Sequence, residues 1–248
     1  MADERYYDEW ATFYDAEHGA MTDDITFYVD RARDADGPVL EVGCGTGRVY
    51  LELLRAGVDA DGIDLSTGML SVLREKARAD GLEPSVRQAD VTDFDPDREY
   101  ALVIIPFRAF LHLTDFADQL AALETIRDAL ASGGQLAMNI FAPDFDIICE
   151  RYGTPQESTI ERDGDEYTLV STTEFVDEVD CIVRDRRKLY DADGEQVFAQ
   201  EFRIKLLFKR ELELLFSLAG FSDWSVAGGF DGDELTSPTQ EMVWVADK

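Results

Sequence analysis

Residues 39–47 constrain the fold of this chain more than any other segment. They read Val-Leu-Glu-Val-Gly-Cys-Gly-Thr-Gly, a short apolar run that ends in three alternating glycines and leads into an amphipathic stretch at 48–57. Glycine lacks the Cβ atom that would keep backbone away from a ligand, and it takes the positive φ angles of a tight strand-to-helix bend. The free N–H groups at the start of the following helix point at whatever binds there. This pattern predicts a nucleotide-binding turn.

The spacing of the glycines and an acidic neighbour narrow the class of ligand. Dinucleotide-binding folds carry G-x-G-x-x-G, whereas Gly43, Gly45 and Gly47 alternate in this chain. Glu41 stands two residues before the first glycine, where its carboxylate would repel a pyrophosphate but could hold an ammonium group. A cationic ligand without phosphates therefore fits this turn better.

The form E-V-G-C-G-T-G resembles the first signature motif of the class I S-adenosylmethionine (SAM) methyltransferases. The resemblance implies a Rossmann-like fold, SAM as the methyl donor and S-adenosylhomocysteine (SAH) as the product. For the motif alone, the alternative is a glycine-rich turn that only packs a helix against a strand.

Apolar strands and amphipathic helices alternate through the first half of the chain. Strands are predicted at 39–42, 59–64, 85–89, 100–106 and 135–141, and helices at 46–56, 66–80 and 116–130, the last with Gly133 and Gly134 at its end. The run at 100–106, Y-A-L-V-I-I-P, is typical of a strand buried on both faces of a parallel sheet. Such alternation predicts a doubly wound βαβ sheet with right-handed crossovers.

The pattern changes after the fifth predicted strand. Residues 158–207 show β-rich stretches separated by the turn signals D-G-D and D-A-D-G, which predicts an antiparallel meander. A helix at 209–220 and strands at 224–228 and 241–246 then restore the alternation of helices and strands. The predicted fold class is α/β, a Rossmann-like doubly wound seven-stranded mixed sheet with an inserted antiparallel β-sheet after strand five.

These patterns predict four structural units. They are an N-terminal helical lid (1–36), a SAM-binding core (37–142), an inserted sheet that serves as acceptor roof or dimer surface (143–207), and a C-terminal helix and β-hairpin that complete the core (208–248). A final helix and hairpin after an inserted sheet resembles many small-molecule methyltransferases.

Acidic side chains outnumber basic ones by 53 to 23, which gives a formal charge of −30. Binding of nucleic acid requires a basic surface, so this composition argues against a nucleic-acid substrate. Diffuse acidity resembles proteins of salt-loving microbes, because molar salt shortens the Debye length to about 3 Å and removes the self-repulsion. An acidic face that meets a basic partner is the alternative.

Length and composition set further bounds. A chain of 248 residues can bury one sizeable core. Its N-terminus is too charged for a secretory signal, and no apolar run approaches the ~20 residues needed to span a bilayer, which predicts a cytoplasmic protein without a membrane partner. The three cysteines, Cys44, Cys149 and Cys181, show no C-x-x-C spacing and predict neither a disulfide framework nor a metal site.

The resemblance assigns cofactor contacts to the loops that follow the first strands. Asp64 ends the second strand and matches the carboxylate that accepts hydrogen bonds from both ribose hydroxyls; capping the next helix is the alternative, although Ser66 is a better cap. Asp90 matches the residue that takes the adenine amino group, but it belongs to a crowded acidic loop in which any carboxylate can face solvent. The full predicted cofactor set is Glu41, Gly43, Cys44, Gly45, Gly47, Asp64, Leu65, Met69, Asp90, Val91 and Ile105.

Residues 105–113 are expected to face the same crevice, at the carboxyl end of the fourth strand. They lack the N/D-P-P-Y motif that family members acting on nucleic-acid or protein amines often carry. Phe107 and Arg108 are predicted substrate contacts, with Arg108 placed to neutralise an acidic substrate. His112 is the candidate general base, since imidazole exchanges protons near neutral pH. Its alternative role is to fix the start of a helix.

The N-terminal segment is rich in aromatic residues and is predicted to cover the site. Tyr6 and Tyr7 are candidate substrate contacts, and Tyr14 is a second catalytic candidate. The same stripe of rings is also compatible with the core face of a helix packed on the sheet.

The predicted function is SAM-dependent transfer of a methyl group to a small-molecule acceptor, to nitrogen or oxygen more readily than to carbon. Transfer from a sulfonium needs mainly proximity, alignment and exclusion of water, so catalytic side chains can be few. The alternatives are a SAM-binding protein without catalysis and, disfavoured by Glu41 and the glycine spacing, an NAD(P)-dependent oxidoreductase. The acceptor and a homodimeric state are left open by the sequence.

Overall fold

The structure, a computed structural model, describes residues 2–248, with side chains from Tyr6 onward. Over these residues seven strands form the core sheet, in the spatial order β10 (Asp223–Gly228), β11 (Glu241–Asp247), β5 (Leu130–Phe141), β4 (Tyr100–Ile105), β1 (Val39–Val42), β2 (Ala60–Asp64) and β3 (Ser85–Gln88). Strands β1 to β5 run parallel, while β11 is antiparallel to both of its neighbours. The strand order reverses between β1 and β4, and such a point forms a ligand crevice at the carboxyl ends of the strands.

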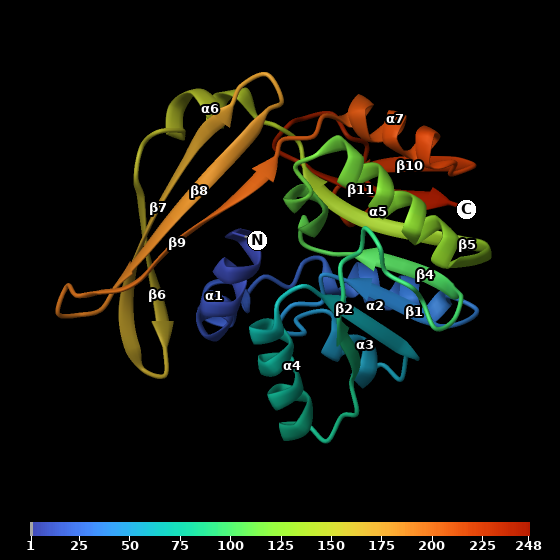
Figure 1. Cartoon of the computed structure of the whole chain (residues 1–248), viewed down its shortest axis with the longest axis horizontal. Coiled ribbons are helices and arrows are strands. Elements are labelled where there is room, and N and C mark those ends of the chain that lie inside the picture. Colours follow the sequence, from blue (N-terminus) through green and yellow to red (C-terminus); the bar gives the residue numbers. More distant parts are fainter. Residues whose placement is uncertain (1) are drawn as a thin grey trace.

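Helices cover both faces of this sheet (Figure 1). One face packs against α2 (Ile25–Asp34), α3 (Tyr50–Arg55) and α4 (Thr67–Ala79), and the other against α5 (Phe116–Ala129) and α7 (Lys209–Ala219). Buried apolar side chains on the two faces form two separate clusters, as two-sided burial of a parallel sheet requires. The predicted Rossmann-like fold is confirmed.

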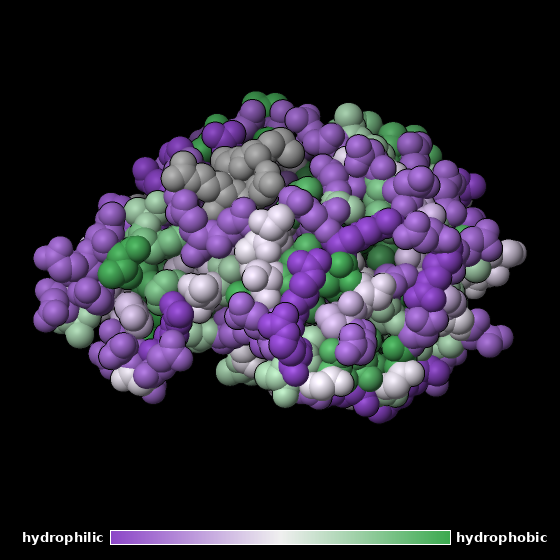
Figure 2. Space-filling model, turned by 60° about the horizontal axis from the view of Figure 1, so that its bottom comes forward, coloured by the Kyte–Doolittle hydropathy of each residue, from purple (hydrophilic) through white to green (hydrophobic). Residues whose placement is uncertain are grey.

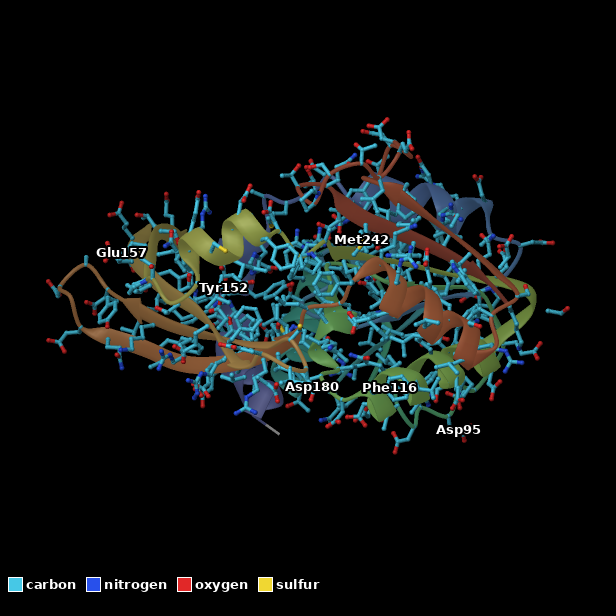
Figure 3. The ribbon with its side chains drawn as sticks, turned by 90° about the horizontal axis from the view of Figure 1, so that it is seen from above. Asp95, Phe116, Tyr152, Glu157, Asp180 and Met242 are labelled. Atoms are coloured by element: carbon cyan, nitrogen blue, oxygen red, sulfur yellow. The ribbon has the colours of Figure 1, made fainter. Side chains whose placement is uncertain are left out.

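A second sheet is inserted after β5. Its order is β6 (Gln156–Arg162), β7 (Asp165–Asp177), β8 (Ile182–Tyr190) and β9 (Gln196–Lys205), all antiparallel, and the short helix α6 (Phe145–Arg151) precedes it. The predicted meander at 158–207 is therefore confirmed. Figure 3 shows Glu157 far out on this sheet, Met242 on the core, and Tyr152 between them.

Two predicted boundaries are wrong for identifiable reasons. The helix expected from Thr46 begins at Tyr50, because Gly47 has a φ of +86° that no helical residue takes. Gly133 and Gly134 lie inside β5 rather than at the end of α5. A Cβ on Gly134 would stand 3.0 Å from the Tyr100 carbonyl oxygen, so glycine here permits close approach of β4.

Helix α1 (Ala2–His18) lies between the core and the inserted sheet (Figure 1). On the core side, Asp8 accepts hydrogen bonds from the Ser66 hydroxyl at 2.6 Å and the Gly68 N–H at 2.8 Å. On the sheet side, the buried rings of Tyr6 and Trp10 belong to a cluster with apolar side chains of β6 to β9. Helix α1 thus ties the two sheets together.

The surface agrees with the composition. The face in Figure 2 is mostly hydrophilic, as expected for a chain with a formal charge of −30. Within the described part of the chain, no helix combines the length and apolar character needed to cross a membrane.

Candidate active site

A cavity of about 480 Å³ opens at the carboxyl ends of the central strands. Its floor comes from the loops after β1, β2, β3 and β4, one wall from α1, and its roof from the inserted sheet. The cavity therefore joins three parts of the chain that are far apart in sequence.

The glycine turn forms one end of the floor. Gly43 and Gly45 line the cavity with φ angles of +71° and +54°. A Cβ on Gly43 would stand 3.0 Å from the Cβ of Ala109, whereas a Cβ on Gly45 would find no atom nearer than 3.9 Å. Gly43 thus lets the loop after β4 approach the glycine turn, and Gly45 keeps its backbone exposed to the cavity.

Asp64 lies beside this turn at the end of β2. Its Oδ2 accepts a hydrogen bond from the Gly45 N–H and its Oδ1 one from the Ser66 N–H, both at 2.8 Å. Burial raises the pKa of this carboxyl, although the same two N–H groups favour the ionised form. Each oxygen keeps a lone pair for a further donor. Ser66 itself caps α4 by accepting from the Met69 N–H, as predicted.

The other predicted adenine contacts also line the cavity: Leu65, Met69, Asp90, Val91 and Ile105. Asp90 accepts hydrogen bonds from the N–H and hydroxyl of Thr92, both at Oδ1, so Oδ2 stays available to a ligand. The structure thereby distinguishes Asp90 from the other acids of its loop, which do not line the cavity.

Three members of the predicted cofactor set do not line the cavity: Glu41, Cys44 and Gly47. The Cys44 side chain is buried, with its sulfur 3.0 Å from where a Cβ on Gly62 would stand, and Gly47 packs against Leu51 and Leu73. Both residues therefore support the turn by packing on its side away from the cavity. The buried Glu41 has an Oε2 with no hydrogen-bond partner, and burial raises the pKa of its carboxyl well above the ordinary value. Its contact with an ammonium group stays a prediction.

The loop after β4 has unusual backbone geometry. Phe107 and Arg108 both have positive φ angles, 53° and 67°, which residues other than glycine rarely take. A partly buried network holds them there: Asn139 Oδ1 accepts from the Phe107 N–H at 2.8 Å, and the Arg108 guanidinium forms a two-point ion pair with Glu241. The loop thus presents the 3₁₀ turn η1 (Ala109–His112) to the cavity.

Arg108 lines the cavity, but its charge is already neutralised. Its Nε and Nη2 donate to the two carboxylate oxygens of Glu241 at 2.9 and 2.7 Å. The guanidinium also lies over the Phe141 ring, 5.2 Å from the centroid. In this arrangement Arg108 holds the loop, and its contact with an acidic substrate stays a prediction.

His112 and Tyr7 meet inside the cavity although 105 positions separate them. The Tyr7 hydroxyl lies 2.8 Å from His112 Nε2, and the two rings make an edge contact at 5.3 Å between centroids. The Phe202 ring lies 5.4 Å from the His112 ring. A polar pair enclosed by rings is an arrangement that can exchange a proton away from bulk water.

Tyr14 and Tyr6 also line the cavity but differ from Tyr7 in their surroundings. Burial raises the pKa of both phenols well above their ordinary value. Tyr6 is only 1% exposed and packs on Trp10 and Phe202, so its ring is mainly part of the hydrophobic contact between α1 and the inserted sheet. The rings of Tyr6 and Trp10 thus form the packed face of α1, whereas the roles of Tyr7 and Tyr14 toward a substrate stay a prediction.

The roof carries polar residues that sequence reasoning missed. Arg187 on β8 forms ion pairs with Glu17 of α1 at 2.5 Å and with Asp185 at 3.2 Å, and Thr173 on β7 donates to Asp185 Oδ2 at 3.0 Å. Arg187, Asp185 and Thr173 all line the cavity. The available signal was strand alternation within the basic cluster at 184–188: residues 185 and 187 share one face, and residues 184 and 186 share the other.

The residues of the floor fit SAM. Glycine backbone at positive φ, a buried carboxylate with free lone pairs after β2 and a second carboxylate after β3 provide acceptors for ribose hydroxyls and for an amino group. The orphaned Glu41 Oε2 is a further unsatisfied acceptor close to the same turn. No arginine is positioned to bind a phosphate without first leaving a carboxylate, since the arginines among the described lining residues are Arg108 and Arg187.

Comparison with known proteins agrees with this geometry. Residues 39–134 match the model of a methyltransferase domain family. The dTDP-3-amino-3,6-dideoxy-alpha-D-glucopyranose N,N-dimethyltransferase of Streptomyces fradiae is 26% identical over 245 residues, which cover 93% of this chain and 90% of the relative. The cypemycin N-terminal methyltransferase of a Streptomyces species is 26% identical over 252 residues, the whole of both chains.

Solved structures share the fold over nearly all of the chain. A SAM-dependent methyltransferase from Clostridium acetobutylicum superposes with a TM-score of 0.77 at 18% identity, covering 98% of each chain. A SAM-bound amino pentose methyltransferase from Micromonospora echinaspora gives a TM-score of 0.70 at 24% identity, covering 94% of each chain. Given its motif at 39–47, its strand order and the match of residues 39–134 to a methyltransferase domain, the chain is a SAM-dependent methyltransferase with a Rossmann-like fold.

Proposed function

We propose that this methyltransferase transfers the methyl group of SAM to the nitrogen of a small-molecule amine. The observation that carries the proposal is the cavity that joins Asp64 and the glycine turn to the Tyr7–His112 pair and to the roof. Nitrogen is favoured as acceptor because the Streptomyces fradiae relative named above is described as an N,N-dimethyltransferase. The enclosed volume suits a small molecule better than a folded macromolecule.

The floor of the cavity would hold the cofactor. Bound SAM supplies an activated methyl group on a sulfonium. Asp64 would accept the ribose hydroxyls with the lone pairs that Gly45 and Ser66 leave open, and Asp90 Oδ2 would accept from the adenine amino group. Leu65 and Ile105 would provide apolar surface for the adenine ring.

The other side of the cavity would hold and deprotonate the acceptor. An amine attacks only through its free lone pair, and formation of the new C–N bond leaves its nitrogen positively charged with a proton to lose. His112 Nε2 is placed to accept that proton, directly or through the Tyr7 hydroxyl 2.8 Å away. The rings of Tyr7, Tyr14 and Phe202 line this side of the cavity and would exclude water from the charged centre.

Acceptor choice is then assigned to α1, residues 107–112 and the inserted sheet. The test is incubation with SAM carrying a deuterated methyl group and a panel of small amines, each paired with the alcohol of the same skeleton. Mass spectrometry should find the label on amines and not on the matched alcohols. Labelling of the alcohols alone would contradict nitrogen as the acceptor atom.

A further inference from the structure

We infer that the acceptor is an unphosphorylated amine that carries a second positive charge, and that Asp185 is the residue that recognises this second charge. The inference rests on the proposed function and goes further by naming the class of acceptor. It comes from the charge balance of the cavity and from the position of one carboxylate in the roof.

The basic groups around the cavity are already neutralised. Arg108 is paired at two points with Glu241, and Arg48, whose guanidinium lies 4.7 Å from the centre of the Phe107 ring, is paired at two points with Asp24. Both carboxylate partners are mostly buried and hold these arginines in two-point pairs. Among the described residues, an anionic acceptor would find at this end of the cavity no arginine that is not already paired with a carboxylate.

The roof group, in contrast, has an excess of negative charge. Arg187 contributes one positive charge, and its partners Glu17 and Asp185 contribute two negative charges. The net charge of the three side chains is therefore −1 when His18, which lies 3.1 Å from Glu17, is neutral. All three side chains are at most 16% exposed. A buried charge without a counterion is costly, so this group favours a cationic ligand.

Asp185 is the member of the group that is both held in place and open to the cavity. Thr173 donates to its Oδ2 at 3.0 Å, and Arg187 Nε donates to its Oδ1 at 3.2 Å. Each oxygen therefore keeps further acceptor capacity. Glu17 is engaged differently, since both of its oxygens accept from Arg187 Nη1 and it does not line the cavity. The carboxylate of Asp185 is thus the group available to a ligand cation.

This charge pattern excludes the acceptor class of one relative. The Streptomyces fradiae enzyme is described as acting on a dTDP-linked amino sugar. A pyrophosphate would bring negative charge into a cavity whose lining arginines, among the described residues, are each paired with carboxylate. The present chain should therefore discriminate against such nucleotide-linked acceptors.

The test compares three probes of equal chain length that differ only in the group opposite the amine: putrescine (cationic), n-butylamine (apolar) and γ-aminobutyrate (anionic). Each is titrated into the full-length protein saturated with SAH, so binding is measured without methyl transfer. Thymidine diphosphate is the fourth probe. We expect putrescine to bind about 10–100-fold more tightly than n-butylamine, the range for a hydrogen bond to a charged group, and the two anionic probes to bind more weakly still.

Asp185→Asn keeps the size of the side chain and its bond to Thr173 while removing the charge. We expect it to abolish the preference for putrescine over n-butylamine and to leave the affinity for SAH unchanged. Asp165→Asn, an exposed position at the start of β7, is the matched control and should retain the preference. Circular dichroism of each variant verifies the fold.

Absence of putrescine binding, equal binding of the three amines, tighter binding of an anionic probe, or a preference that survives Asp185→Asn would each overturn the inference. Failure of the proposed function has a different signature: putrescine would bind with the expected preference, yet no amine would receive the labelled methyl group from SAM.

Discussion

The floor and the roof of the cavity are built in different ways. The floor consists of loops that each follow a strand of the parallel sheet, and backbone N–H groups hold its first loops, as where Gly45 and Ser66 donate to Asp64. The roof and the loop after β4 contact α1 through side chains that are far apart in sequence, such as Arg187 with Glu17 and His112 with Tyr7. Backbone geometry thus forms the floor, whereas pairing of charged and aromatic side chains joins α1 to the roof and to the loop after β4.

This difference explains how one fold can keep its cofactor and vary its acceptor. The floor depends on φ angles that few residues besides glycine adopt, so it tolerates little change. The roof depends on pairs of side chains on an inserted sheet, and a changed pair alters the charge of the cavity without touching the core. Four experiments test the comparison, from the largest expected effect to the smallest.

Arg187→Met should have the largest effect because it removes the arginine that pairs with the buried carboxylates of Glu17 and Asp185. Removal of one partner of a buried ion pair costs about 3–5 kcal/mol of unfolding free energy. Urea denaturation measures the change. Arg186→Met is the control, since Arg186 lies on the outer face of the same strand with its side chain 46% exposed, and it should cost about 1 kcal/mol or less. Equal losses in the two variants would contradict the buried link between α1 and the roof.

Gly45→Val should abolish most SAH binding without unfolding the roof. It forces a β-branched residue to a φ of +54° and fills space that faces the cavity. We expect at least a ~100-fold loss of affinity by calorimetry, about 2.7 kcal/mol. Gly57→Val is the control, because Gly57 has a φ of +77° and open space around it away from the cavity. If the control lost affinity equally, backbone strain alone would explain the result.

Lowering the pH should affect Asp64 in the floor and the pair of Glu17 and Arg187 at the roof at different pH values. The pKa of Asp64 is raised by burial, so the ionised form proposed to accept the ribose hydroxyls should be lost at a higher pH than for an ordinary carboxyl. For Glu17, burial raises the pKa, but His18 and Arg187 together lower it below the ordinary value. Its ion pair therefore contributes stability above the unfolded-state pKa that is lost only as the pH falls through the lowered folded-state value.

As the pH falls toward the ordinary range of carboxyl groups, SAH affinity should fall before the pair of Glu17 and Arg187 is lost, so α1 should stay docked. Calorimetry follows the affinity, and the fluorescence of the buried Trp10 follows the docking of α1. In Asp64→Asn, SAH binding should lose this pH dependence. Simultaneous loss of binding and docking in the unaltered protein would argue against separate control of the halves.

Added salt should stabilise the protein mainly by screening the charges of its exposed surface, and it should have the smallest effect on the floor and the roof of the cavity. Screening relieves repulsion among the exposed carboxylates of a chain with a charge of −30, so the melting temperature should rise by several degrees between low and molar potassium chloride. The buried pair of Arg187 and Glu17 should contribute little to this rise. A flat melting temperature would contradict the resemblance to proteins of salt-loving microbes.

The sequence predicted the core and the floor well because both depend on local patterns. The glycine turn, Asp64 and Asp90 follow strands that hydrophobic periodicity identifies, and parallel strands place their ends along one edge of the sheet. Arg187 could not be found in this way, since its partner Glu17 is 170 positions away and no local pattern joins them. The pairing of Arg108 could not be predicted for the same reason, since its partner Glu241 lies on β11, 133 positions later.

The central claim is that the floor binds the cofactor and the Tyr7–His112 pair acts on the acceptor. The most direct measurement compares the SAH dissociation constant and kcat in Asp64→Asn and His112→Asn. Asp64→Asn should weaken SAH binding by about 10–100-fold. His112→Asn should leave SAH binding within about twofold and lower kcat by at least ~100-fold, the contribution of a general base. Loss of SAH affinity in His112→Asn, or unchanged affinity in Asp64→Asn, would contradict this division of the cavity.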